Sequence, residues 1–188
     1  MIKEHNIYGG GIKTNQNGLL FEEETSLNES LINAGYTIEG KEIYDKHYNK
    51  IGLSISKHSL YNFLEDNNIN YTDYNSKKWL PDEAFLNLEN HTLYIVEKKY
   101  QESHGSVDEK LPNCHFKRKE YLKLFRPLGF KVTYIYVFND WFKQKQYKDT
   151  LEYIQDMGCE YYFNEIPFES IGFITSYLDK YNSKVRVF

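Results

Sequence analysis

The 188-residue chain is poor in the residues that build disulfide-stapled, fibrous and membrane-spanning proteins. Its two cysteines, Cys114 and Cys159, do not match the ligand spacing of a zinc site, so we expect a hydrophobic core alone to hold the fold. Four prolines and eleven glycines exclude collagen-like and low-complexity chains. No apolar run approaches the ~18 residues of a membrane-spanning helix, so we expect no membrane partner.

The apolar stretch of a secretory signal is absent from the first residues, which read MIKEHNIYGGG. Together with the two unpaired cysteines, this predicts a reducing, cytoplasmic location. The sequence also contains no internal repeat and no low-complexity linker. A chain of this length is typical of one domain, and we expect residues 1–188 to form a single domain.

The charge is unevenly distributed along the chain, although the formal net charge is only −4. Residues 98–148 carry a net charge of +7, whereas the residues before and after them carry −7 and −4. A compact basic region between acidic flanks is an electrostatic footprint that suits a polyanion. A solvated lysine-rich face has the same composition, so charge alone leaves both interpretations open.

Hydrophobic periodicity and turn residues divide the chain into helices and strands. After a flexible loop at 9–18, we expect one amphipathic helix at 19–34 that ends at Gly35, with an apolar stripe of Leu20, Leu27, Leu31 and Ala34. Further helices are expected at 57–66, from about 112 to 125, and at 146–157. Strands are expected within 36–55 and at 80–86, 92–97, 131–138 and 160–163. This order predicts an α/β domain with a mixed central β-sheet flanked by α-helices.

Two of the predicted strands are apolar on both faces, with the sequences TLYIVE at 92–97 and KVTYIYVF at 131–138. Such strands are typical of the covered centre of a sheet. In the helix between them, a rotation of ~100° per residue puts Arg118 on the apolar stripe and turns Lys119 and Lys123 outward. Arg118 is therefore expected to be partly buried, either as a structural residue or facing a site.

Three charged residues converge if the predicted strands 80–86 and 92–97 pair as a hairpin. Residues i and i+2 of a strand share a face, so Glu97 and Lys99 point the same way, with Gln101 two residues further along. Hairpin pairing brings Asp82 beside Glu97. Two carboxylates that bind Mg²⁺, with a lysine to orient water or to offset charge on a phosphate, are suited to phosphodiester hydrolysis. Taken separately, Pro81-Asp82 is ordinary turn chemistry and Glu97-Lys98-Lys99 an ordinary strand end.

These residues resemble a known family. Pro81-Asp82 followed by Glu97-Lys98-Lys99-Tyr100-Gln101 is similar to the signature of PD-(D/E)XK nucleases in its E-x-K-x-Q form. The segments 18–25 and 103–111 are similar to segments of bacterial type II restriction endonucleases. The resemblance covers about residues 18–138, the expected PD-(D/E)XK nuclease core, with 36–78 as a possible DNA-recognition insertion.

The resemblance implies a Mg²⁺-dependent type II restriction endonuclease, which cuts double-stranded DNA at a specific sequence and leaves 5′-phosphate ends. It assigns Asp82, Glu97 and the Lys98 carbonyl as metal ligands and Lys99 as the third catalytic residue. A glutamate on the first helix would reach the site through water. Glu22 fits this role best, with Glu23 and Glu24 as competitors, and a solvated helix end is the simpler interpretation of all three.

The implied partners are double-stranded DNA and a second copy of the chain in a homodimer, with a cognate DNA methyltransferase as a genetic rather than a physical partner. The residues expected to contact DNA are Ser103, Ser106, Lys110, Lys117 and Lys119. Two alternatives remain open: a repair or junction-resolving nuclease of the same fold, and a catalytically silent DNA-binding module.

Overall fold

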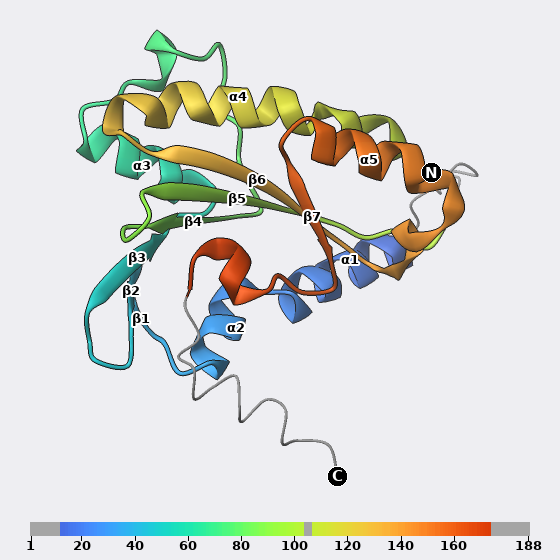
Figure 1. The fold of residues 1–188 in the computed structure, drawn as a ribbon, viewed down its shortest axis with the longest axis horizontal. Helices are drawn as coiled ribbons and strands as arrows, with labels where there is room; N and C mark the ends of the chain where they lie inside the picture. Colours follow the sequence, from blue (N-terminus) through green and yellow to red (C-terminus); the bar gives the residue numbers. More distant parts are fainter. Residues whose placement is uncertain (1–11, 104–106, 174–188) are drawn as a thin grey trace, which may run out of the picture.

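A computed structural model describes residues 12–103 and 107–173, which form one mixed seven-stranded sheet with helices on both faces (Figure 1). The strands lie side by side in chain order and are β1 (Thr37–Glu39), β2 (Glu42–Tyr44), β3 (Lys50–Ser54), β4 (Glu83–Asn87), β5 (Thr92–Lys99), β6 (Lys131–Phe138) and β7 (Glu160–Phe163). Neighbours from β1 to β5 are antiparallel, and β6 and β7 continue the sheet parallel to β5. The predicted α/β class with a mixed sheet is confirmed.

Within residues 12–103 and 107–173, five α-helices cover the sheet, and Figure 1 shows α4 and α5 on one side of it and α1 and α2 on the other. They are α1 (Ile12–Glu24), α2 (Leu27–Asn33), α3 (His58–Asp66), α4 (Cys114–Phe125) and α5 (Lys148–Asp156). The core on the α4 side includes Leu93 and Ile95 of β5, and the core on the α2 side includes Tyr94 of the same strand. The predicted two-sided burial of β5 and β6 is thus confirmed, because their alternate residues are buried in different core clusters.

The amino-terminal prediction is wrong in two respects. The expected loop at 9–18 is helical from Ile12 onward, and the expected helix at 19–34 is broken between Glu24 and Leu27. Ser26 causes the break by accepting a hydrogen bond from the Glu29 amide as the N-cap of α2. A change of helix axis at Ser26 also explains why Leu20, expected on the apolar stripe, is 53% exposed. Residues 9–11 lie outside the described part of the chain.

Arg118 is a structural residue rather than a site-facing one. Its Nε donates to the Val132 carbonyl at 3.1 Å, and one terminal nitrogen donates to the Met157 carbonyl at 3.3 Å. The guanidinium thereby ties α4 to β6 and to the turn after α5. Both cysteines are free and buried, as expected of a fold that its core stabilises.

Candidate functional site

The β4–β5 hairpin sets the geometry of the site. Its tight turn is fixed by the Asn87 side chain, whose oxygen accepts hydrogen bonds from the amides of Glu89 and Asn90. In the resulting register Glu83 lies opposite Val96. Asp82 therefore lies at the level of Glu97, where its carboxylate accepts a hydrogen bond from the Lys98 amide at 2.8 Å.

The predicted constellation comes together around the ammonium of Lys99. Its Nζ lies 3.0 Å from Glu97 Oε2, 2.9 Å from the Lys98 carbonyl and 3.6 Å from Asp82 Oδ2. The Glu97 side chain is only 5% exposed, whereas that of Asp82 is 28% exposed. The site is thus buried at Glu97 and opens to solvent at Asp82.

The two carboxylates keep Lys99 positively charged. Burial by itself lowers the pKa of Lys99, but attraction to Glu97 and Asp82 outweighs burial and leaves the pKa above its ordinary value. Lys99 is therefore an ammonium at neutral pH, and it can offset negative charge but cannot accept a proton.

The oxygens around Lys99 are suited to a hard divalent cation. Two carboxylates and a peptide carbonyl already surround a positive charge, and these donors are the kind that Mg²⁺ takes alongside several waters. Within residues 12–103 and 107–173, no group of three or more His, Cys, Asp and Glu side chains is arranged to hold a metal. A cation here would therefore depend on the Lys98 carbonyl and on water for its remaining ligands.

Lys117 belongs to this site, although we expected it only to contact DNA. Its Nζ reaches from α4 to within 3.1 Å of Glu97 Oε1, so each oxygen of Glu97 faces a different lysine. The position of Lys117 on the helix could have been predicted from helical periodicity. Lys117 lies three residues after Cys114 and four before Tyr121, both buried against the sheet.

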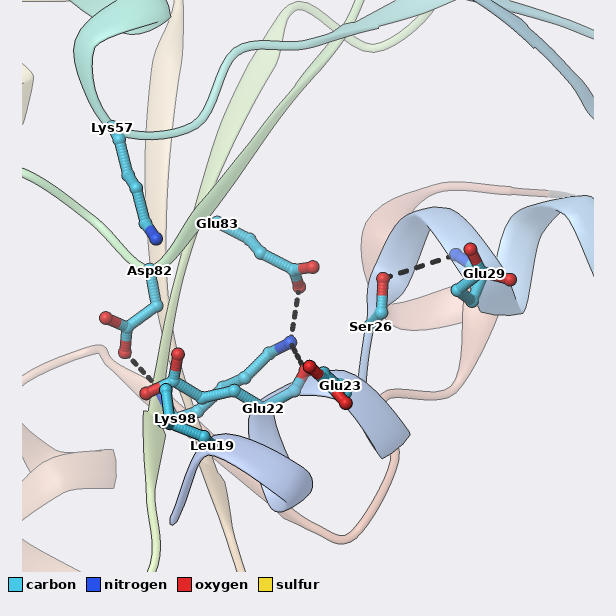
Figure 2. Close-up of a pocket in the computed structure, with 9 residues that line it drawn as sticks. All are labelled: Leu19, Glu22, Glu23, Ser26, Glu29, Lys57, Asp82, Glu83 and Lys98. Carbon is cyan, nitrogen blue, oxygen red and sulfur yellow. Dashed lines mark hydrogen bonds and ion pairs between the residues drawn. The ribbon is translucent and has the colours of Figure 1, made fainter. Parts of the chain in front are cut away.

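Glu22 and Asp82 line the same pocket, which has a volume of about 550 Å³ (Figure 2). The Glu22 side chain extends from α1 toward Asp82, in line with its predicted place near the site. Glu23 also lines this pocket, whereas Glu24 is exposed and lies outside its lining. A water-mediated role for Glu22 remains a prediction.

The other predicted residues are less closely involved. Because β5 ends at Lys99, strand alternation no longer orients Gln101, whose backbone pairs with the Asn139 side chain. The Gln101 carboxamide is buried and makes no hydrogen bond within the described residues. Ser103, Lys110 and Lys119 are exposed on the surface, and Ser106 lies outside the described residues.

A buried ion pair beneath the site escaped the sequence analysis. Lys98 Nζ lies 3.1 Å from Glu83 Oε2 and donates to the carbonyl of Glu22 in α1 at 2.8 Å (Figure 2). Both Glu83 oxygens accept from the Leu27 amide, the first of α2, at 3.2 Å. The pair thus puts a cation at the carboxyl end of α1 and an anion at the amino end of α2, which suits both helix dipoles. Burial raises the pKa of Glu83, and Lys98 opposes that rise.

Lys57 projects into the pocket from a strained backbone. With φ +51° and ψ −122° it occupies a region that essentially only glycine adopts freely, and Figure 2 shows its side chain extending toward Asp82. We expect Lys57→Gly to raise the free energy of unfolding by about 1 kcal/mol, because relief of strain exceeds the entropy cost of glycine. Urea denaturation measures this change.

Asn68→Gly is the matched control for this prediction. Asn68 also has a positive φ, +60°, but asparagine tolerates the left-handed region. Its replacement should leave the unfolding midpoint almost unchanged. A Lys57→Gly protein that is no more stable than the wild type would show that the backbone at Lys57 is not strained.

These features define the chain as an α/β protein whose mixed sheet carries an acidic, lysine-lined site at the end of a β-hairpin. No helix in the described part of the chain has the length and apolar character needed to cross a membrane. Comparisons with protein-family models, with curated proteins and with solved structures find no match.

Proposed function

We propose that this protein is a Mg²⁺-dependent endonuclease of the PD-(D/E)XK type that hydrolyses phosphodiester bonds in double-stranded DNA. The observation that carries the proposal is the convergence of Asp82, Glu97 and the Lys98 carbonyl on the Lys99 ammonium at the end of β5. Carboxylates beside a lysine whose pKa they raise suit a reaction in which negative charge grows on a phosphate.

Each residue has a distinct task in this proposal. Asp82, Glu97 and the Lys98 carbonyl would hold the cation, which would supply Lewis-acid polarisation of the phosphate and a lower pKa for an attacking water. Lys99 stabilises the charge that develops on the phosphate oxygens. Lys117 holds Glu97 in place through the carboxylate oxygen that does not face Lys99.

In its specific form, the proposal is that the protein is a type II restriction endonuclease. The basic region at 98–148 supplies exposed lysines, among them Lys110 and Lys119, that suit phosphate contacts. The proposal includes a homodimer, as the restriction-enzyme resemblance implies, and a cognate methyltransferase encoded alongside it. A junction-resolving or repair nuclease is the second candidate, and the exposed aromatic residues described below favour it.

Digestion of a long, unmethylated phage DNA tests the proposal. In Mg²⁺ the purified protein should yield discrete fragments with 5′-phosphate ends, and a chelator in excess over Mg²⁺ should abolish cutting, because the carboxylates alone cannot activate water. Preferential cutting of branched or mismatched DNA would select the junction or repair nuclease. Salt-sensitive duplex binding by a folded protein that never cuts any DNA would contradict the nuclease and indicate a silent binding module.

A further inference from the structure

An exposed aromatic and basic surface lies beside the candidate site. Lys77 Nζ is 3.8 Å from the centroid of the Trp79 ring, and the Phe116 ring meets Trp79 edge to face at 5.6 Å. Phe116 is 51% exposed, whereas Trp79 is partly buried and packs against the core. We call this the Trp79 surface and define it as Lys77, Trp79, Phe116 and Lys117.

Lys117 links the Trp79 surface to the site. Its Nζ lies 6.0 Å from the centroid of the Trp79 ring and 3.1 Å from Glu97 Oε1. Trp79 also precedes Asp82 by only three residues in the chain. A strand whose phosphate lies between Asp82 and Lys99 would therefore pass close to these rings.

The loop that carries Lys77 and Trp79 is anchored to the fold. The Tyr61 hydroxyl in α3 accepts from the Trp79 amide at 2.6 Å and donates to the Trp79 carbonyl at 2.9 Å. The Asn75 side chain donates to the carbonyl of Glu120 in α4 at 3.1 Å. The aromatic rings are thus held ready for a ligand, which reduces the entropy lost on binding.

The combination of aromatic rings and lysines indicates which chemical groups the ligand presents. Lysines alone suffice to contact the phosphates of a duplex, whose base faces are covered by stacking. An exposed aromatic ring beside a lysine can stack on a base only where that base is unpaired. The Lys77 ammonium lies over the Trp79 ring and forms no ion pair within the described residues, so it can contact a phosphate of a strand that reaches this ring.

We propose that the Trp79 surface binds unpaired bases of a nucleic-acid strand next to the phosphate that the site attacks. The inference deepens the proposed function and rests on it for the position of that phosphate. It identifies the substrate as DNA with an unpaired segment, either pre-existing or opened by the enzyme. Binding itself requires neither metal nor cleavage.

Tryptophan fluorescence tests this inference, because the chain has only two tryptophans and Trp141 can be replaced. We expect a 15-nucleotide dT strand, added in EDTA, to quench the emission of Trp141→Phe through stacking near Trp79. A 15-base-pair duplex should quench it much less. Phe116→Ala should weaken dT binding by about tenfold or more, since stacking on the ring is lost.

Leu122→Ala is the matched control, since Leu122 is an apolar residue on the same helix with 36% exposure. It should bind dT like the parent protein. Anisotropy of a labelled dT strand with Trp141 intact provides the same comparison if Trp141→Phe fails to fold. Equal binding of duplex and dT, or full dT binding by Phe116→Ala, would overturn the inference.

The inference and the proposed nuclease can fail separately. Cleavage of duplex DNA without dT binding would remove only the role of the Trp79 surface. Binding of dT that depends on Phe116, in a protein that never cuts, would support the surface and remove the nuclease. Failure of every oligonucleotide to bind the folded protein would overturn the inference and favour a protein partner for these rings.

Discussion

Glu97→Ala is expected to lower the rate of Mg²⁺-dependent DNA cleavage by about 10³-fold or more, since metal activation contributes several kcal/mol to the barrier. Glu97 is the most buried of the proposed ligands and, among the described residues, the only one that forms ion pairs with both Lys99 and Lys117. Its removal therefore takes away a ligand and also the group that positions two lysines. Initial rates on a defined DNA fragment measure the effect.

Lys99→Ala should abolish cleavage to a similar degree but leave the carboxylates free to bind metal. Calorimetric titration with Mg²⁺ then separates the roles, because Glu97→Ala loses affinity for the ion whereas Lys99→Ala retains it. Glu152→Ala, which removes an exposed carboxylate of α5, is the control and should cut normally. Near-wild-type cleavage by folded Glu97→Ala or Lys99→Ala would contradict the proposed site, and circular dichroism checks that each variant is folded.

Lys98→Met is expected to lower the free energy of unfolding by about 3–5 kcal/mol. The Lys98 side chain is only 3% exposed, and its loss would leave the Glu83 carboxylate buried without a counter-charge. The carbonyl of Glu22 at the end of α1 would also lose the hydrogen bond that Lys98 donates to it. Urea denaturation in EDTA measures the change without interference from bound metal.

The cost of Lys98→Met should depend on pH. The pKa of Glu83 in the folded protein lies above its ordinary value. The contribution of Glu83 to the free energy of unfolding is therefore lost as the pH rises through that pKa. Removing Lys98 takes away the attraction that lowers the pKa of Glu83. The substitution should therefore cost less stability below about pH 5 than at about pH 8.

Lys148→Met is the matched control, because it breaks an exposed ion pair with Glu152. Its cost should be at most about 1 kcal/mol and nearly independent of pH. If Lys98→Met were no more costly than Lys148→Met, the buried pair would not be what fastens α1 and α2 to the sheet.

Much of the sheet and part of the site follow from short-range pattern. The two-sided apolar runs at β5 and β6 predict buried strands, and pairing of the neighbouring strands expected at 80–86 and 92–97 as a hairpin brings Asp82 beside Glu97. Alternation along β5 puts Glu97 and Lys99 on one face. These features depend on residues that are close in sequence or paired across one tight turn, where periodicity and turn chemistry act directly.

The tertiary structure alone decided the remaining contacts. Glu83 binds the amide of Leu27, Lys98 binds the carbonyl of Glu22, and Lys117 reaches Glu97 from another element. Each contact joins segments that meet only when helices pack on the sheet, and local periodicity carries no information about such meetings. Sequence pattern therefore predicts the centre of the sheet and the Asp82–Glu97–Lys99 constellation, whereas packing decides which buried charges contact that constellation and which surface adjoins it.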